Sequence, residues 1–267
     1  MSFYGPFISR RLGWSLGLDL LPVVKTCTFD CIYCELGCTP ESGYCSINHR
    51  VEVDQESMER IDYRITTIHK SKIPVKSITL SGNGEPTLVS NIGDVIDLIQ
   101  KIKKDYDSKI PVTVFTNAST IHIPEVQNAL AKVDTIIAKL DTTEQDLFEK
   151  INKPHNSVPT IDQIIGNLKD FKKNHPNTEL IIQTMLISGR LKNFEEEHIY
   201  GLVESYEKIK PDKIFIYTIA RPTAVEKVWK VRLEKLEEIR DIMIQKNNKD
   251  IFDLHGKIDV FGPSSEL

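Results

Sequence analysis

The sequence contains no run of about eighteen consecutive apolar residues, so nothing in it predicts a transmembrane helix. The opening residues, Met1 to Pro6, lack the charged and apolar regions of a signal peptide. Low-complexity segments, short repeats and Gly/Ser-rich linkers that would mark a boundary between domains are absent as well. We therefore expect one domain over residues 1–267, located in the reducing environment of the cytoplasm.

A strong excess of charge of one sign is also missing. The 267 residues carry a formal net charge of −4, the pI is about 6.0, and 40% of the residues are hydrophobic. This composition is ordinary for a globular protein. The overall charge does not indicate a polyanionic partner, although a local patch could still bind one.

Cysteine is scarce, yet three of the five cysteines stand close together. Cys27, Cys31 and Cys34 have the spacing C-x₃-C-x₂-C. Three thiolates can hold three irons of a [4Fe–4S] cluster, which normally takes four ligands, so one iron stays open to a small molecule. A zinc site is less well supported, because it needs four ligands and no second cysteine pair follows. A disulfide framework is poorly supported in a chain without a signal peptide and with few cysteines for its length. The remaining alternative is that three structural cysteines have this spacing by chance.

Apolar, strand-like runs alternate with amphipathic helical runs along the chain. Such alternation favours an α/β fold with a parallel sheet and right-handed crossovers. A closed eight-stranded barrel needs about 250 residues, so a partial (β/α)₆ TIM-like barrel fits better, with a cysteine loop over residues 25–50. We expect strands over residues 16–24, 75–80, 112–115, 134–140, 180–187 and 213–218, helices over 54–70, 92–102, 124–130, 161–171, 194–209 and 228–245, and an extended tail over 254–261.

In a sheet of this kind, functional residues collect at the rim where the strands end. The cysteine loop follows the first expected strand, and the glycine-rich run SGNGEPT, residues 81–87, follows the second. The other conspicuous polar residues near strand ends are Asn117, Lys139, Asp141, Gln183, Tyr217 and Arg221. Their placement on one rim supports a site there.

Two motifs together resemble those of the radical S-adenosylmethionine (SAM) superfamily. They are the three-cysteine loop, with the aromatic Tyr33 just before its last cysteine, and the glycine-rich run in its G-x-G-E-P-T form. The similar region extends from Gly5 to about Arg221.

The resemblance implies the open (β/α)₆ barrel and a [4Fe–4S] cluster held by Cys27, Cys31 and Cys34. It also implies that SAM binds the open iron through its amine and carboxylate. An electron passing through the cluster then cleaves SAM to a 5′-deoxyadenosyl radical, which abstracts hydrogen from a substrate.

The same resemblance suggests residues that contact SAM. Glu85 is expected to accept a hydrogen bond from the methionyl ammonium. Gly82 and Gly84, on either side of Asn83, are expected to let the backbone approach the ligand. The alternative is a surface turn with Glu85 near the positive end of a helix. Tyr33 is expected to stack near the adenine, or to pack as a plain aromatic under the loop.

Two further turns depart from the family pattern while keeping its polar residues. Asn117 is followed by Ala118 where the family has glycine, and Lys139 precedes Leu140-Asp141 where the family has serine. Asn117, Lys139 and Asp141 are nevertheless candidate SAM contacts. Lys139 could pair with a SAM carboxylate or with an acidic substrate group, or simply form a salt bridge with Asp141.

The runs GPFISRRLG, INKPH and RPT, at residues 5–13, 151–155 and 221–223, resemble a group of radical SAM proteins related to wyosine-type tRNA-modifying synthases. Three functions stay open. The first is an enzyme acting on a small molecule or nucleoside. The second is an enzyme acting on tRNA or protein, by glycyl-radical activation or methylation for example. The third is a non-enzymatic iron–sulfur electron carrier.

We favour a radical SAM enzyme with an unidentified substrate and without a membrane partner. Its partners would be SAM and an external electron donor of the flavodoxin or ferredoxin type. Cys38 and Cys45 are expected to be ordinary thiols of the cysteine loop or an oxidation-prone pair, with a substrate-crosslinking thiol as the alternative, and His155 is expected to be a loop histidine.

Overall fold

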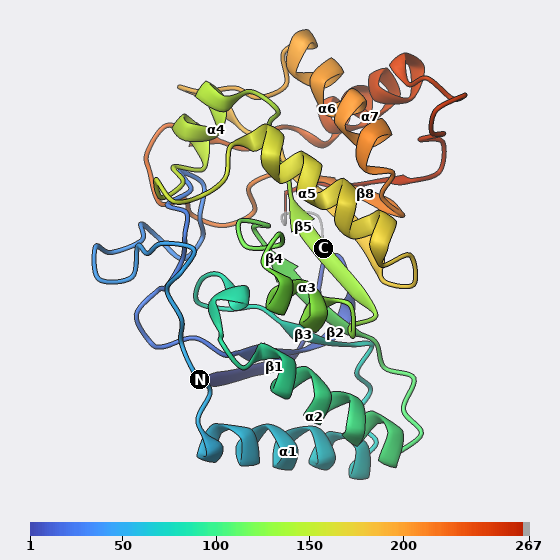
Figure 1. The fold of residues 1–267 in the computed structure, drawn as a ribbon. Coiled ribbons are helices and arrows are strands. Elements are labelled where there is room, and N and C mark those ends of the chain that lie inside the picture. The colour runs from blue at the N-terminus through green and yellow to red at the C-terminus, as the bar shows by residue number, and fades with distance from the viewer. Residues whose placement is uncertain (264–267) are drawn as a thin grey trace.

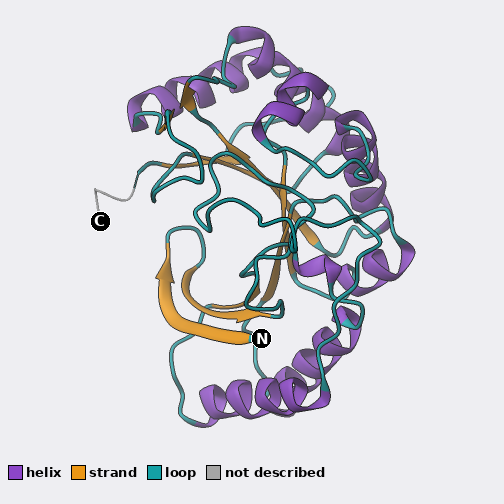
Figure 2. Cartoon of the chain, turned by 90° about the vertical axis from the view of Figure 1, so that its left-hand side faces the viewer, coloured by secondary structure: helices purple, strands orange, loops and turns teal. Residues whose placement is uncertain are grey.

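The computed structural model describes residues 1–263, and its centre is a curved eight-stranded sheet (Figures 1 and 2). The strand order is β1-β2-β3-β4-β5-β6-β8-β10. The first pair is antiparallel, and all other neighbours are parallel. The strands of this sheet are β1 (Ser2–Ser9), β2 (Gly13–Asp19), β3 (Ser77–Leu80), β4 (Val112–Thr116), β5 (Thr135–Lys139), β6 (Glu179–Met185), β8 (Lys213–Tyr217) and β10 (Ile258–Phe261), while β7 (Ser188–Gly189) and β9 (Val228–Trp229) form a separate pair.

Helices cover the convex face of the sheet and leave the concave face free of them (Figure 2). Between β2 and β3 lies α1 (Gln55–Lys70), and every following crossover between parallel strands of the sheet also contains helix. The others are the 3₁₀ helix η1 (Pro86–Leu88) and α2 (Ile92–Asp105), α3 (Pro124–Leu130), α4 (Gln145–Ile151), α5 (Ile161–Asn174), α6 (Glu196–Ile209) and α7 (Leu233–Lys246).

The two faces of the sheet differ in chemistry because side chains alternate along each strand. On the convex face, Leu16 of β2 and Ile136 of β5 are completely buried in the main core beneath the helices. The concave face carries a second, smaller apolar cluster, whose buried members are Ile137, Ile181 and Phe215, with Leu12, Phe115 and Phe261 packed against them.

The six expected parallel strands are all present, which confirms the α/β partial barrel. The structure adds β1, which pairs with the edge of β2, and the extended tail is β10. The first expected strand ends early, at Asp19, and the chain then turns through Pro22, which has no N–H to donate to a ladder.

Two helical expectations need correction. The helix expected over residues 228–245 begins only at Leu233, because Val228 and Trp229 pair with Ser188 and Gly189 instead. Helix α4 was not expected at all. Its seven residues are too few to display a helical repeat in the sequence, and packing of Leu147, Phe148 and Ile151 stabilises it.

None of the helices within residues 1–263 combines the length and the apolar character needed to cross a membrane.

A capping box at the start of α5 yields a test of local stability. The Thr160 side chain accepts from the Gln163 N–H, and the Gln163 side chain accepts from the Thr160 N–H. We expect Thr160→Ala to lower the free energy of unfolding by about 1 kcal/mol. Lys169→Ala, on the exposed side of the same helix, should change it by less than about 0.5 kcal/mol. Urea unfolding of both variants checks this; equal effects would contradict it.

Candidate active site

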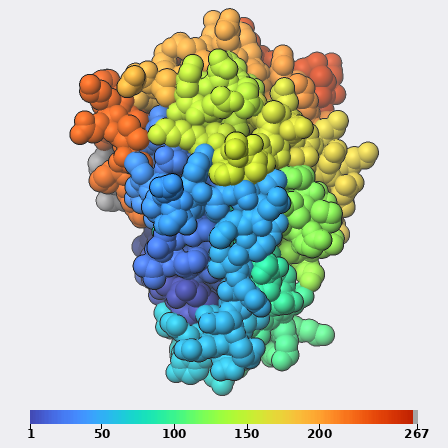
Figure 3. Space-filling view, turned by 60° about the vertical axis from the view of Figure 1, so that its left-hand side comes forward, coloured from blue at the N-terminus to red at the C-terminus, as the bar shows by residue number. Residues whose placement is uncertain are grey.

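The cluster loop, residues 25–50, lies at the rim where the parallel strands end, and it is attached to the barrel on two sides. On one side, Thr26 donates its N–H to the Asn83 carbonyl (2.9 Å) and accepts from the Glu85 N–H (3.0 Å). On the other, Ile32 donates to the Ile151 carbonyl (2.9 Å), within the segment that follows β5. Figure 3 shows the loop, in blue, packed against that yellow-green segment.

The glycines of the SGNGEPT turn are explained by this attachment. A Cβ at Gly84 would lie 1.7 Å from the carbonyl oxygen of Thr26, and one at Gly82 would lie 2.3 Å from Cγ of Asp19. Both glycines also have φ values that other residues rarely adopt, +142° and +155°. The close approach is therefore between the turn and neighbouring protein groups. Asn83 ties the turn down further by donating to the carbonyls of Pro22 (3.0 Å) and Val23 (2.6 Å).

The three motif cysteines are free thiols, and amide groups point at two of their sulfur atoms. Cys27 Sγ accepts from the Phe29 N–H (3.4 Å) and from Asn117 Nδ2 (3.6 Å), and Cys31 Sγ accepts from Asn152 Nδ2 (3.5 Å). Burial raises the pKa of Cys27, and it raises that of Cys31 to about 11. A positive metal group would offset this by stabilising the thiolates.

These side chains suit an iron–sulfur cluster. Such clusters take thiolate ligands, and N–H groups that donate to the sulfurs adjust the reduction potential of the cluster. Within residues 1–263, no three His, Cys, Asp or Glu side chains are gathered tightly enough to form a finished metal site. The three thiols are nevertheless carried by one short loop, and rotation about each Cα–Cβ bond moves the sulfur atom. The residues therefore fit the group by chemistry and position.

Glu85 is buried, and its carboxylate is occupied by donors of the protein itself. One oxygen accepts from Thr87 N (3.2 Å), Thr87 Oγ1 (2.6 Å) and Thr116 Oγ1 (2.7 Å), and the other accepts from Asn117 N (2.6 Å). Burial raises the pKa of Glu85, although these hydrogen bonds act in the opposite direction. The carboxylate thus joins the turn after β3 to the end of β4, and it caps η1.

Asn117 connects this carboxylate to the cluster loop. Its backbone N–H binds Glu85, while its side-chain amide donates to Thr28 Oγ1 (2.9 Å) as well as to Cys27 Sγ. Ala118, which replaces the glycine expected from the family pattern, keeps a left-handed conformation at φ +64° and is completely buried. The turn therefore retains a glycine-like shape without glycine.

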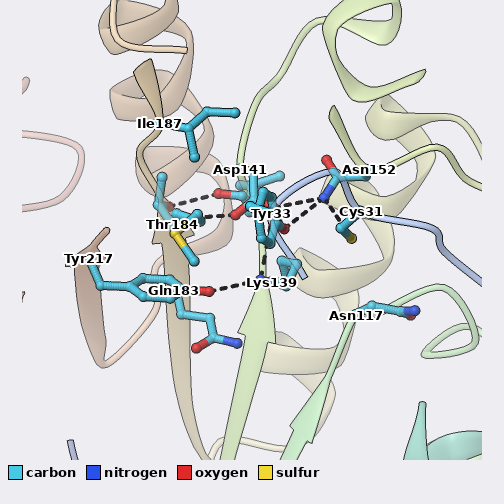
Figure 4. Close-up of polar contacts among 12 residues, drawn as sticks. Cys31, Tyr33, Asn117, Lys139, Asp141, Asn152, Gln183, Thr184, Ile187 and Tyr217 are labelled. Carbon is cyan, nitrogen blue, oxygen red and sulfur yellow. Dashed lines mark hydrogen bonds and ion pairs between the residues drawn. The ribbon is translucent and has the colours of Figure 1, made fainter. Parts of the chain in front are cut away.

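A buried polar network lies around Asp141, just after β5 (Figure 4). One carboxylate oxygen accepts from Met185 N (2.8 Å); the other accepts from the Tyr33 hydroxyl and from Asn152 Nδ2 (2.7 Å). Asn152 also donates to the Tyr33 oxygen (3.0 Å), so three chain segments meet at this carboxylate. Burial, followed by the charge of Asp141, raises the pKa of Tyr33, which keeps its hydroxyl protonated and donating.

Lys139 lies beside this network on the concave face. Its Nζ is 2.8 Å from the Tyr217 hydroxyl, 3.9 Å from Asp141 Oδ2 and 4.9 Å from the centre of the Tyr33 ring. Burial alone would lower the pKa of Lys139, but Asp141 and Tyr217 outweigh it and raise the pKa, so the amine is charged. The salt bridge to Asp141 is present, with an N–O distance near the upper limit for an ion pair. Asn117, Lys139, Asp141 and Asn152 also line one cavity of about 10 Å³, room for about one water.

Other expected residues lie outside these contacts. Arg221 is exposed and pairs with Glu35 of the cluster loop (3.0 Å). Cys38 is exposed, Cys45 Sγ is 3.7 Å from the Cys27 carbonyl, and His155 is bound to Ser157.

Sequence reasoning missed two residues that the structure brings to the site. Asn152 was noted only as part of the INKPH run, and the resemblance of that run to related radical SAM proteins was its one signal. Arg11, from the β1–β2 turn, reaches the concave face and donates to Gln183. Arg11 belongs to the family-like GPFISRRLG run, but nothing in that run indicates a contact with β6.

This chain belongs to the radical SAM superfamily, whose sequence profile matches residues 21–203. Among curated relatives, a UPF0026 protein of Methanocaldococcus jannaschii is 30% identical; the alignment covers 96% of this chain and 75% of that protein.

Two solved structures share the fold. Streptococcus suis SuiB bound to SAM superposes with a TM-score of 0.60 at 19% identity, covering 91% of this chain but only 50% of SuiB. TYW1 with a lysine-pyruvate adduct bound gives a TM-score of 0.60 at 18% identity, covering 87% and 74%. This chain therefore spans about half the length of SuiB.

Superfamily membership has direct consequences. The chain is an enzyme whose cofactors are a [4Fe–4S] cluster and SAM, and it is similar to proteins that carry out SAM-dependent radical chemistry. A similarity at the level of the fold does not identify the substrate.

The buried, hydrogen-bonded carboxylate of Glu85 gives a second testable prediction. Glutamine offers one acceptor oxygen in place of two, so Glu85→Gln leaves at least one buried donor without a partner. We expect the free energy of unfolding to fall by about 1–3 kcal/mol. Glu204→Gln, on an exposed position of α6, should change it by less than about 0.5 kcal/mol. Denaturant titration of both variants measures the difference, and an unaltered stability of Glu85→Gln would show that the network does not depend on the carboxylate.

Proposed function

We propose that Cys27, Cys31 and Cys34 bind one [4Fe–4S] cluster and leave its fourth iron to SAM. The observation that carries this proposal is the attachment of their loop. Backbone hydrogen bonds hold it at the rim on both sides, and amides from β4 and from the segment after α4 point at two of the three sulfurs. N–H donors of this kind stabilise thiolates that are partly removed from water.

Cys27, Cys31 and Cys34 would hold the cluster, which when reduced would supply the electron for cleavage of SAM to methionine and a 5′-deoxyadenosyl radical that takes hydrogen from the substrate. The residues of the chain bind and orient the reactants and exclude water. The electron would come from an external donor of the flavodoxin or ferredoxin type. A cytoplasmic location is part of the proposal, because all five cysteines are free thiols and such thiols persist in a reducing compartment.

For SAM, we propose that the Gly82–Glu85 turn holds the methionyl part. Oε1 of Glu85 fixes the turn through Thr87 and Thr116, while Oε2, which accepts from Asn117 N alone, keeps an acceptor position for the methionyl ammonium.

The adenosyl part of SAM would lie toward Tyr33, Asn117, Lys139 and Asp141. The buried hydrogen bonds of Tyr33 and Asp141 hold that wall rigid. Lys139 supplies a positive charge next to it. A rigid wall positions the adenosyl carbon relative to the substrate hydrogen, which is the main demand that this chemistry makes on a protein.

The ligand assignment predicts the iron content of variants. Anaerobically reconstituted protein should contain about four irons and four sulfides per chain. Cys27→Ala, Cys31→Ala and Cys34→Ala should each lose most of them, because each removes a ligand. The double variant Cys38→Ala with Cys45→Ala serves as the matched control and should keep the wild-type content. Loss of the cluster in the control, or about eight irons in the wild type, would contradict the assignment.

The reaction itself is tested without the substrate. Reduced with dithionite and supplied with SAM, the protein should slowly release 5′-deoxyadenosine and methionine, since SAM on the open iron already lies next to the electron source. Chromatography of anaerobic reactions measures the product. Each variant of the three motif cysteines should form none, whereas the Cys38/Cys45 double variant should form it. A fully loaded, reducible cluster that binds SAM but yields no product, even with cell extract added, would favour an electron carrier instead.

A further inference from the structure

Arg11 is a cation on the concave face of the barrel that the proposed SAM contacts do not use. It comes from the turn between β1 and β2, and its guanidinium carbon lies 5.0 Å from the centre of the Phe115 ring and 4.9 Å from that of Tyr217. Its Nη1 donates to the Gln183 side-chain oxygen. These partners belong to β4, β6 and β8, so the arginine lies across the inner face of the sheet.

No carboxylate balances this charge. Within residues 1–263, no Asp or Glu oxygen lies within 4.0 Å of Arg11. Two acids on the same face have other partners, and a third, Asp259 of β10, is exposed and acts on Lys213. Glu179 binds Lys213 (2.9 Å) and Thr135 (2.9 Å), and Asp141 is held by the network described above. The pKa of the neighbouring Arg10 is lowered by burial and next by the charge of Arg11.

Lys139 adds a second positive charge close by. It bonds the hydroxyl of Tyr217 while Arg11 lies over the ring of the same tyrosine. Lys139 is also the register partner of Gln183, which accepts from Arg11. Two cations therefore meet at Tyr217. Asp141 is 3.9 Å from Lys139, and Glu35, which acts on the neighbouring Arg10, is paired with Arg221.

Arg11 is half-buried, and its guanidinium lies against two aromatic rings without a carboxylate partner, a setting in which an anion of a bound ligand can pair with it. Arginine presents five N–H donors in a planar fork that matches carboxylate and phosphate oxygens. Of the hydrogen bonds described for the Arg11 side chain, Gln183 receives the single one. The remaining donors, together with the positive charge of Lys139, suit one small oxyanion.

We infer that Arg11, assisted by Lys139, binds an anionic group of the substrate, a carboxylate or a phosphate, on the concave face of the barrel. The inference rests on the proposed function, because it places that group on the face below the cluster loop. None of the described side-chain contacts of Arg11 is with the cluster loop or with the Gly82–Glu85 turn. The anion is therefore assigned to the substrate and not to the SAM carboxylate.

The test uses the reconstituted enzyme with saturating SAM, titrated calorimetrically with inorganic phosphate or malonate at constant ionic strength. Malonamide, which has nearly the shape of malonate without its charge, is the neutral control. We expect saturable binding of at least one anion, and no binding of malonamide. Arg11→Gln should lower the affinity for the anion at least tenfold. Lys101→Gln, which removes an exposed charge from α2, should leave that affinity unchanged. Preference for phosphate points to a phosphorylated substrate, and preference for malonate to a carboxylate.

Arg11→Lys keeps the charge and much of the packing but loses the planar fork, and should weaken binding less than Arg11→Gln. Thermal unfolding shows whether both variants are folded. If Arg11→Gln is not folded, weaker anion binding by Arg11→Lys and the absence of malonamide binding test the inference instead.

Several results would overturn the inference: no saturable anion binding by the wild type, equal binding by Arg11→Gln, binding of malonamide as tight as that of malonate, or a loss of SAM affinity in Arg11→Gln as large as the loss for the anion. Failure of the proposed function is distinguishable, since it would appear as absent 5′-deoxyadenosine in the wild type whatever the titrations give.

Discussion

The close approach of two backbones, at Thr26 and Gly84, is the constraint on which the site depends. Two hydrogen bonds join the cluster loop to the glycine-rich turn here, and any Cβ at residue 84 would overlap the Thr26 carbonyl. The contact places Cys27 beside the end of β4, within reach of the Asn117 amide. The loop also buries Phe29, Ile32 and Tyr33 in the main core, so backbone pairing and apolar packing together set its position.

Buried polar groups then make the rim rigid. The carboxylates of Glu85 and Asp141 each collect donors from separate segments of the chain, and each is almost inaccessible to water. In surroundings of low dielectric, hydrogen bonds of this kind are strong, and a missing partner is costly. The two networks therefore favour one arrangement of the loops, which radical chemistry needs because the reactive carbon has to meet a single hydrogen.

The two faces of the sheet differ in chemistry and therefore in role. The convex face is apolar and covered by helices, so its side chains contribute to packing and stability. The concave face carries charged and aromatic side chains, among them Arg11, Lys139 and Tyr217. Structures below 20% identity share this architecture, and a shared fold does not by itself determine the reaction.

The sequence by itself determined the alternation of strands and helices and the two motifs, because hydrophobic periodicity and residue spacing are local properties. From these, the partial barrel, the superfamily and its cofactors could be predicted. Only the tertiary structure decided what each polar residue touches. That Glu85 is bound by Thr87, Thr116 and Asn117, that Asn152 joins the site, and that Arg11 crosses to β6 are contacts between residues up to 172 positions apart. Such pairings arise from packing of whole elements, which no local pattern encodes. Strand β1 and helix α4 were missed for the same reason, since neighbouring elements stabilise them more than their own residues do.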